Sequence, residues 1–274
     1  MDCLIVTDLD GTLLNHEHRL GDYTRAVLDA LWSRGVEVML ASGRHHRDMR
    51  GICEQVSYRG YLISSNGATV HDDQGRLVDW SAIDPECLDF LLRDPLFERV
   101  HTNVYLIDEW LVETPEPALL GYHQDSGFSY RVTDFGALTE VPVVKVYYYH
   151  TDAAHLRDLE RVIEQRYGDR LCTTYALPVV LEVMAKGVSK GDALDLVLQR
   201  TGRTREQVIA FGDGRNDLEL LSIAGKGLLM SNAVPALKAA LPTLEVIGSN
   251  AEESVARYLE RLLGSAGPAC DRVA

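Results

Sequence analysis

The feature that most constrains this chain is a short apolar run that ends in two aspartates. Residues 3–6 read Cys-Leu-Ile-Val, as expected of a strand covered on both faces of a parallel sheet. Asp8 and Asp10 follow at its carboxyl end. Because side chains alternate along a strand, the two carboxylates can point the same way and meet one metal ion or one phosphate. Gly11 then allows a sharp turn and a close approach to a ligand.

The Asp-Leu-Asp-Gly sequence can be an ordinary strand and turn, a ligand site, or the start of a calcium loop. A calcium loop needs glycine at its sixth position and glutamate at its twelfth, where this chain has Leu13 and Arg19. The calcium loop is therefore excluded. Motifs further along the chain decide between the other two interpretations.

Such motifs follow in a recognisable order. They are Ser42-Gly43-Arg44, Lys190 within Gly187-Val188-Ser189-Lys190-Gly191, and Gly212-Asp213-Gly214-Arg215-Asn216-Asp217. Together with Asp8-Leu9-Asp10-Gly11-Thr12, they resemble the four motifs of the haloacid dehalogenase superfamily, and more narrowly its Cof-type (subfamily IIB) phosphatases. Their order and spacing extend over nearly the whole chain.

The apolar pattern of the first 82 residues predicts alternating strands and helices. Strands are expected over residues 3–6, 36–41 and 61–63, with a helix capped by Asp22 and another around Met49. This alternation is typical of an α/β fold with a parallel sheet and right-handed crossovers. The same rhythm resumes with a helix after Ser189 and a strand over 208–211. The resemblance implies a Rossmann-like core.

The pattern between these two parts is different. It predicts a hairpin, two later strands and a helix between them, over residues 104–112, 143–149, 179–183 and 156–163. We therefore expect an inserted α+β domain over 83–184 and a core made of 1–82 and 185–274. The resemblance implies that the insertion is a C2-type cap, which excludes water and selects the leaving group. The tyrosines at 147–149 are expected to lie half in the core and half on the surface.

Composition limits the classes of binding partner that the chain can have. The chain has 27 Lys and Arg against 41 Asp and Glu, a formal charge of -14, which argues against nucleic acid or an anionic membrane surface as a partner. A small phosphorylated metabolite stays compatible if the site supplies local positive charge. Five scattered cysteines favour reduced thiols. No signal peptide or bilayer-spanning apolar run is recognised, so a cytoplasmic location is expected; the sequence carries no indication of oligomeric state.

Positive charge is expected at two points of the site. Lys190 would occupy the first turn of its helix, where the helix dipole disfavours a cation unless an anion lies in front of it. Ser42, with the amides of Gly43 and Arg44, is expected to form a helix N-terminus that receives a phosphate. The two histidines that follow, at 45–46, are expected to be solvated.

A metal site is expected from carboxylates on separate strands. Asp213 follows a buried strand, and with Asp8 and the backbone carbonyl of Asp10 it would form a site made only of oxygen ligands. Such ligands suit Mg²⁺. Asn216 and Asp217, one helical turn later, can orient substrate or the water around the metal.

The resemblance implies chemistry through a covalent aspartyl phosphate. Asp8 would be the nucleophile, and Asp10 would protonate the leaving alcohol and later accept a proton from water. Asp10 must then start protonated, which neighbouring carboxylates would favour. Ser42, Lys190 and Mg²⁺ would stabilise charge on the phosphoryl oxygens. Substrate binding would involve Gly43, Arg44, Lys190 and Asn216.

The leading hypothesis is therefore a Mg²⁺-dependent phosphatase of small phosphomonoesters. Sugar phosphates are candidate substrates, and so is pyridoxal phosphate, because Gly43-Arg44-His45-His46 resembles a loop of Cof-type enzymes that act on it. A phosphomutase or phosphotransferase would use the same aspartyl phosphate with another acceptor. A non-catalytic metabolite-binding protein is the alternative from another class, although binding alone would not require the nucleophile Asp8.

Overall fold

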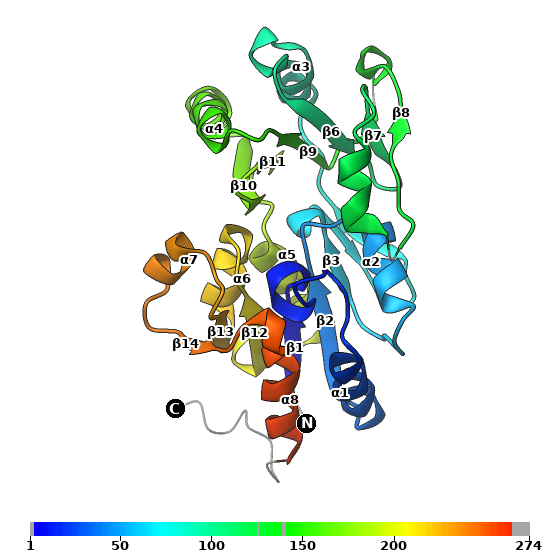
Figure 1. Ribbon diagram of the computed structural model, residues 1–274, viewed down its shortest axis with the longest axis vertical. Coiled ribbons are helices and arrows are strands. Elements are labelled where there is room, and N and C mark those ends of the chain that lie inside the picture. The colour runs from blue at the N-terminus through cyan, green and yellow to red at the C-terminus, as the bar shows by residue number, and fades with distance from the viewer. Residues whose placement is uncertain (1–2, 125, 139–140, 265–274) are drawn as a thin grey trace.

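The computed structural model describes residues 3–124, 126–138 and 141–264. Within these residues the chain forms two units stacked along the long axis of the molecule (Figure 1), each built on its own sheet. The first sheet has the strand order β14-β13-β12-β1-β2-β3-β4-β5. The second has the order β10-β11-β9-β6-β7-β8.

The first sheet is parallel around its centre. Its strands are β1 (Leu4–Thr7), β2 (Glu37–Ala41), β3 (Leu62–Ser64), β4 (Thr69–His71), β5 (Leu77–Trp80), β12 (Val208–Gly212), β13 (Lys226–Met230) and β14 (Glu245–Ile247). β1 pairs in parallel with β2 and with β12, which confirms the predicted α/β fold. The antiparallel strands β4 and β5 extend one edge. They escaped prediction because they are short and β5 is partly exposed.

Helices cover both faces of this sheet. They are α1 (Asp22–Ser33), α2 (His46–Cys53) and α8 (Ser254–Gly264) on one face, and α5 (Lys190–Thr201), α6 (Leu218–Ile223) and α7 (Pro235–Ala240) on the other. Strand β1 shows the division, because Ile5 packs toward the first group while Leu4 and Val6 pack toward the second. Helices α1 and α8, from opposite ends of the sequence, lie side by side (Figure 1).

The start of α1 differs from the prediction. Asp22 is the first helical residue and Gly21 is the N-cap, so Asp22 does not cap the helix. Instead the Glu253 carboxylate, just before α8, accepts hydrogen bonds from the Thr24 N–H (2.9 Å) and hydroxyl (2.7 Å). A Cβ at position 21 would lie 2.3 Å from this carboxylate. A distant acid therefore takes the place of the local cap.

The second unit confirms the inserted α+β cap as a fold; its exact limits at 83–184 stay a prediction. Its elements are α3 (Pro85–Arg93), β6 (His101–Tyr105), β7 (Trp110–Val112), β8 (Arg131–Val132), β9 (Lys145–Tyr149), α4 (Ala153–Tyr167), β10 (Leu171–Leu177) and β11 (Val180–Ala185). One face of the sheet packs on α3 and α4, and the other faces the first unit. Along β9, Val146 and Tyr148 lie in the cap's own core, while Tyr147 lies on the opposite face.

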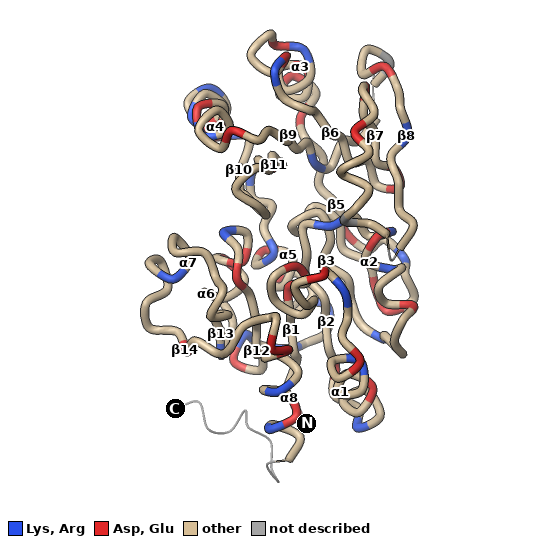
Figure 2. Tube along the Cα trace, viewed as in Figure 1, with Lys and Arg blue, Asp and Glu red and all other residues tan. Residues whose placement is uncertain are grey.

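Short helical turns connect these elements. They are Leu9–Leu13, Ser65–Gly67, Pro95–Phe97, Pro117–His123, Phe135–Ala137, Arg205–Gln207, Arg215–Asp217 and Asn250–Glu252. Acidic and basic side chains are interspersed along both units (Figure 2).

The described residues include most of the cysteines and the helices that bear on the predictions of reduced thiols and of no membrane span. The cysteines at 53, 87 and 172 are free, as predicted, and Cys270 lies outside the described residues. Among the described helices, none has the length and apolar character needed to cross a bilayer. The cytoplasmic location stays a prediction.

Candidate active site

The site is centred on a buried lysine between two carboxylates. Asp8 directly follows β1, and Lys190 is the first residue of α5, as predicted. The Lys190 Nζ donates to Asp8 Oδ1 and to Asp217 Oδ1, both at 2.6 Å, and its side chain is fully buried. Burial by itself lowers the pKa of Lys190, but Asp217 and Asp8 outweigh burial and hold that pKa above its ordinary value. The anions expected in front of this helix are therefore these two carboxylates.

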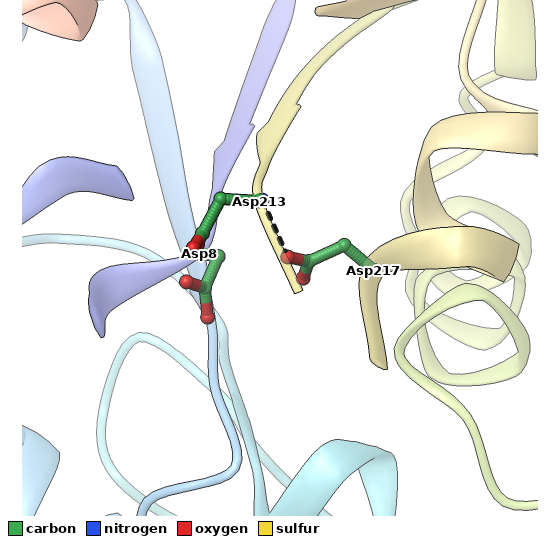
Figure 3. Close-up of side chains that lie close together, drawn as sticks. All are labelled: Asp8, Asp213 and Asp217. Atoms are coloured by element: carbon green, nitrogen blue, oxygen red, sulfur yellow. Dashed lines mark hydrogen bonds between the residues drawn. The ribbon is translucent and has the colours of Figure 1, made fainter. Parts of the chain in front are cut away.

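Asp217 also shapes the loop after β12. Its Oδ2 accepts the N–H groups of Asp213 (2.8 Å) and Gly214 (2.9 Å), and the first of these bonds is drawn in Figure 3. The Thr12 hydroxyl donates to Asp213 Oδ1 at 2.8 Å. These bonds bring Asp213 beside Asp8 although more than 200 residues separate them in the sequence.

The turn after Asp8 fits tightly against Asp213. Gly11 has φ +79°, and a Cβ there would lie 2.3 Å from Asp213 Oδ2. Its carbonyl accepts a hydrogen bond from Asn232 Nδ2 at 2.8 Å. Both the positive φ and the close approach require glycine at this position.

The carboxylates of this cluster outnumber its lysine. Carboxylate oxygens of Asp8, Asp213 and Asp217 lie within 4.8 Å of one another. Figure 3 shows the three side chains close together. Burial raises the pKa of Asp8 well above its ordinary value, and Lys190 offsets only part of this effect. Burial and repulsion from Asp217 raise the pKa of Asp213 to about 7. An excess of buried negative charge presented by oxygen atoms alone fits a hard divalent cation such as Mg²⁺.

Asp10 lies apart from this cluster. The Arg44 guanidinium donates two hydrogen bonds to its carboxylate, from Nε to Oδ2 at 2.6 Å and from Nη2 to Oδ1 at 2.7 Å. His18 Nδ1 lies 2.8 Å from Oδ1. Burial by itself raises the pKa of Asp10, but Arg44 and His18 reverse this effect and hold the pKa well below its ordinary value. The expectation that carboxylate neighbours keep Asp10 protonated is therefore wrong, because its neighbours are basic.

The Ser42-Gly43-Arg44 loop precedes its helix rather than beginning it. Helix α2 starts at His46 with His45 as N-cap, so the prediction of a helix N-terminus at Ser42 is wrong. The Ser42 Oγ accepts the Arg44 N–H at 3.2 Å. Arg44 also donates from Nη1 to Asp48 Oδ2 at 2.9 Å. This guanidinium therefore holds two carboxylates, those of Asp10 and Asp48.

The two histidines after Arg44 are buried, which contradicts the expectation of solvated side chains. His45 and His46 are 1% and 3% exposed. His45 Nε2 lies 3.2 Å from the Leu106 carbonyl oxygen, and His46 Nε2 lies 3.1 Å from Asp108 Oδ1. The β6–β7 connection of the cap covers both rings, and the sequence pattern of α2 alone could not reveal this cover.

A cavity of about 330 Å³ lies between the two units. From the first unit it is lined by most of the predicted site residues, namely Asp8, Asp10, Ser42, Gly43, Arg44, Asp213 and Asn216. Lys190 and Asp217 lie behind Asp8, fully buried. From the cap it is lined by residues that sequence reasoning did not assign, among them Tyr105, Lys145, Tyr147, Tyr149 and Glu182. A signal existed for Lys145 and Glu182, because each is a charged residue inside an otherwise apolar strand.

Known proteins resemble the chain over almost its full length. Residues 5–259 match the family described as haloacid dehalogenase-like hydrolase. A candidate phosphatase of Haemophilus influenzae is 42% identical over 262 residues, covering 95% of this chain and 96% of the relative. A protein of Yersinia enterocolitica named HMP-PP phosphatase is 37% identical over 264 residues, 96% of each chain. The crystal structure of a haloacid dehalogenase-like hydrolase from Bacteroides thetaiotaomicron superposes with a TM-score of 0.83 at 28% identity, covering 95% of this chain and 99% of that one.

Proposed function

Because the chain belongs to the haloacid dehalogenase-like hydrolase family, we propose that it hydrolyses small phosphomonoesters with Mg²⁺ through an aspartyl phosphate on Asp8. The family and the names of the relatives indicate a phosphatase, which argues against the non-catalytic alternative. The observation that carries the proposal is the Asp8 carboxylate, which lines the cavity with Lys190 bonded behind it.

Asp8 would attack the phosphorus atom and displace the alcohol. A carboxylate is a weak nucleophile, but it suffices when cations neutralise the phosphate that it approaches. The Lys190 ammonium provides one such charge, held in place by its bond to Asp217. Ser42 and Gly43 line the same cavity and would contact the phosphoryl oxygens.

Mg²⁺ fits the excess of carboxylates. Asp8 and Asp213, with the backbone carbonyl of Asp10, would hold the ion, and Asp217 would keep the Asp213 loop in place. When bound, the ion supplies positive charge that a phosphoryl group needs as its negative charge shifts in the transition state.

Asp10 would move the proton. In the structure Arg44 keeps its carboxylate ionised, the form that accepts a proton from the hydrolytic water. A substrate phosphate would be a third anion for Arg44, besides Asp10 and Asp48, so its arrival would weaken the Arg44–Asp10 pair. The pKa of Asp10 would then rise, which favours the protonated form that a leaving alcohol needs.

The cavity limits the substrate. A volume of about 330 Å³ between tyrosines of the cap and the phosphate loops of the core suits a small phosphorylated metabolite. Sugar phosphates and pyridoxal phosphate remain candidates, and the compound in the name of the Yersinia relative joins them.

The test is phosphate release from a panel of phosphomonoesters, with and without Mg²⁺. We expect Asp8→Asn to lower kcat by roughly 10⁴-fold or more, because the nucleophile is lost. The exposed Asp169→Asn serves as the matched control and should behave as wild type. Full activity of Asp8→Asn would refute the aspartyl phosphate. Release that depends on an added alcohol acceptor would favour the phosphotransferase.

A further inference from the structure

A buried ion pair of the cap lies against the two loops of the first unit that carry Gly43 and Asn216, which we call the phosphate loops. Lys145 on β9 and Glu182 on β11 lie on the cap face that meets the first unit, with side chains only 2% and 4% exposed. Lys145 Nζ donates to Glu182 Oε1 at 2.6 Å. Taking such a pair out of water is costly unless further partners complete it. The identity of those partners therefore indicates what the pair is for.

The remaining partners come from the first unit. Lys145 Nζ donates to the Gly43 carbonyl oxygen at 2.5 Å. Glu182 Oε2 accepts a hydrogen bond from Asn66 Nδ2 at 2.9 Å. Asn66 is itself buried just after β3, and its Oδ1 accepts from Asn216 Nδ2 at 3.0 Å. One continuous series of bonds thus joins the cap to the loop at Gly43 and to the loop at Asn216.

Aromatic rings complete the surroundings of the lysine. Its Nζ lies 4.5 Å from the centre of the Tyr105 ring and 5.3 Å from that of Tyr147. These contacts favour a cation but come from the cap itself. The hydrogen bonds to Gly43 and from Asn66 are the ones that separate if the two units move apart.

We propose that Lys145 and Glu182 are positioning residues, which fasten the cap over the cavity and hold the Gly43 and Asn216 loops in their places around Asp8. This proposal rests on the proposed phosphatase function. We call Lys145, Glu182 and Asn66 the latch. All hydrogen bonds of the latch form only when both loops adopt the positions seen in the structure. Closing the cap and arranging the loops therefore occur together.

Another buried contact joins the units, because His123 Nδ1 of the cap lies 2.9 Å from Asp48 Oδ2 of α2, but Asp48 reaches the loop at Gly43 only through Arg44. The exposed contacts between the units do not combine these properties. Arg215 Nη1 reaches Glu160 Oε1 at 3.2 Å, but the arginine is 44% exposed. His46 meets Asp108, whose side chain is 65% exposed. Exposed pairs contribute little, because water competes for both partners. The latch is buried and touches the phosphate loops directly.

The experiment uses Lys145→Met, Glu182→Met and the double variant in the full chain. Either single variant leaves a buried charge without its partner and should unfold at a lower temperature, whereas the double variant removes both charges at similar volume and should recover most of that loss. We expect kcat of the double variant to stay roughly 100-fold below wild type, as for a small misplacement of reacting groups. The loss should be equal for p-nitrophenyl phosphate and pyridoxal phosphate.

Tyr148→Phe is the matched control. Tyr148 lies on the same strand but faces the cap's own core, where its hydroxyl donates to the Leu91 carbonyl oxygen at 2.8 Å. This variant should also unfold at a lower temperature but keep the wild-type kcat. It separates the loss of cap stability from the loss of the latch.

The outcomes are distinct. Wild-type kcat in the double variant would overturn the proposal, and so would a loss confined to one substrate, which would make the pair a contact of the leaving group. Small-angle scattering supplies a readout without activity, since the double variant should have a larger radius of gyration than wild type. An equal radius would overturn the latch. If wild-type protein releases phosphate from no member of the phosphomonoester panel, the proposed function fails, and scattering still decides on the latch.

Discussion

The core and the cap each bury a lysine against carboxylates, but the charges are balanced differently. In the core, Lys190 bonds to Asp8 and Asp217, and Asp213 lies beside them, so three carboxylates face one lysine. In the cap, Lys145 has one carboxylate partner, Glu182. Burial lowers the pKa of Lys145 and Glu182 only partly offsets this effect, whereas the pKa of Lys190 is raised overall.

This difference separates two uses of buried charge. A cluster with surplus negative charge is incomplete without a cation, which is the property of a metal and phosphate site. A pair with equal charges needs only the right geometry, which is the property of a fastening between two units. The following predictions test this contrast.

Removal of the core lysine should have the largest effect. Lys190→Met leaves the three carboxylates of the cluster without a cation, so we expect a loss of about 3–5 kcal/mol in the free energy of unfolding. Activity should fall at least about 10³-fold, because charge on the phosphoryl group loses its fixed cation. Chemical denaturation and phosphate release measure the two effects. The exposed Lys186→Met should match wild type, and a Lys190→Met protein as active as Lys145→Met would contradict the contrast.

Addition of Mg²⁺ should affect the core cluster alone. At 100 times the dissociation constant, binding stabilises the folded state by about 2.7 kcal/mol, which raises the melting temperature of a chain of this size by roughly 5–10 °C. Calorimetric melting with and without the ion measures the shift. Asp213→Asn should abolish it and Glu182→Met should keep it. The same shift in both variants would show that the ion binds elsewhere.

The pH dependence of metal binding should be the smallest effect. Because burial and Asp217 raise the pKa of Asp213 from 3.8 to about 7, a proton must leave before the carboxylate can bind Mg²⁺. The affinity should therefore rise with pH below 7 by about tenfold per unit or more, because Asp8, whose pKa burial also raises, must be ionised as well. Titration calorimetry between pH 5.5 and 8 measures it. A flat profile would show that Asp213 is already ionised without the metal.

Asp213 also determines how the stability of the metal-free protein depends on pH. Between its ordinary pKa and 7, the folded metal-free protein holds a proton on Asp213 that the unfolded chain has lost. Stability should therefore fall as pH rises through this window. Asp213→Asn should remove this contribution.

The sequence was sufficient where the site depends on strand ends. Asp8, the loop at Ser42 and Asp213 each follow a parallel strand, and the carboxyl ends of parallel strands share one edge of the sheet. Lys190 was placed correctly because its helix start is marked by Ser189, whose hydroxyl accepts the Asp192 N–H. Local pattern and topology carry this information together.

The sequence was insufficient where a side chain has a choice of partners. Arg44 was assigned to phosphate, yet it holds Asp10, which reverses the expected protonation of that acid. His45 and His46 were expected in water and are covered by the cap. These outcomes depend on how the inserted unit lies on the core, and no pattern within α2 encodes that arrangement.

The order of the strands has a consequence for how the protein is made. The central strand β1 is synthesised first, but one of its two neighbours, β12, begins only at Val208. All strands of the second sheet, ending with β11 at Ala185, leave the ribosome earlier. The cap can therefore fold on the nascent chain while one edge of β1 is still unpaired and open to aggregation. A pause in translation between β11 and β12 would prolong that exposure.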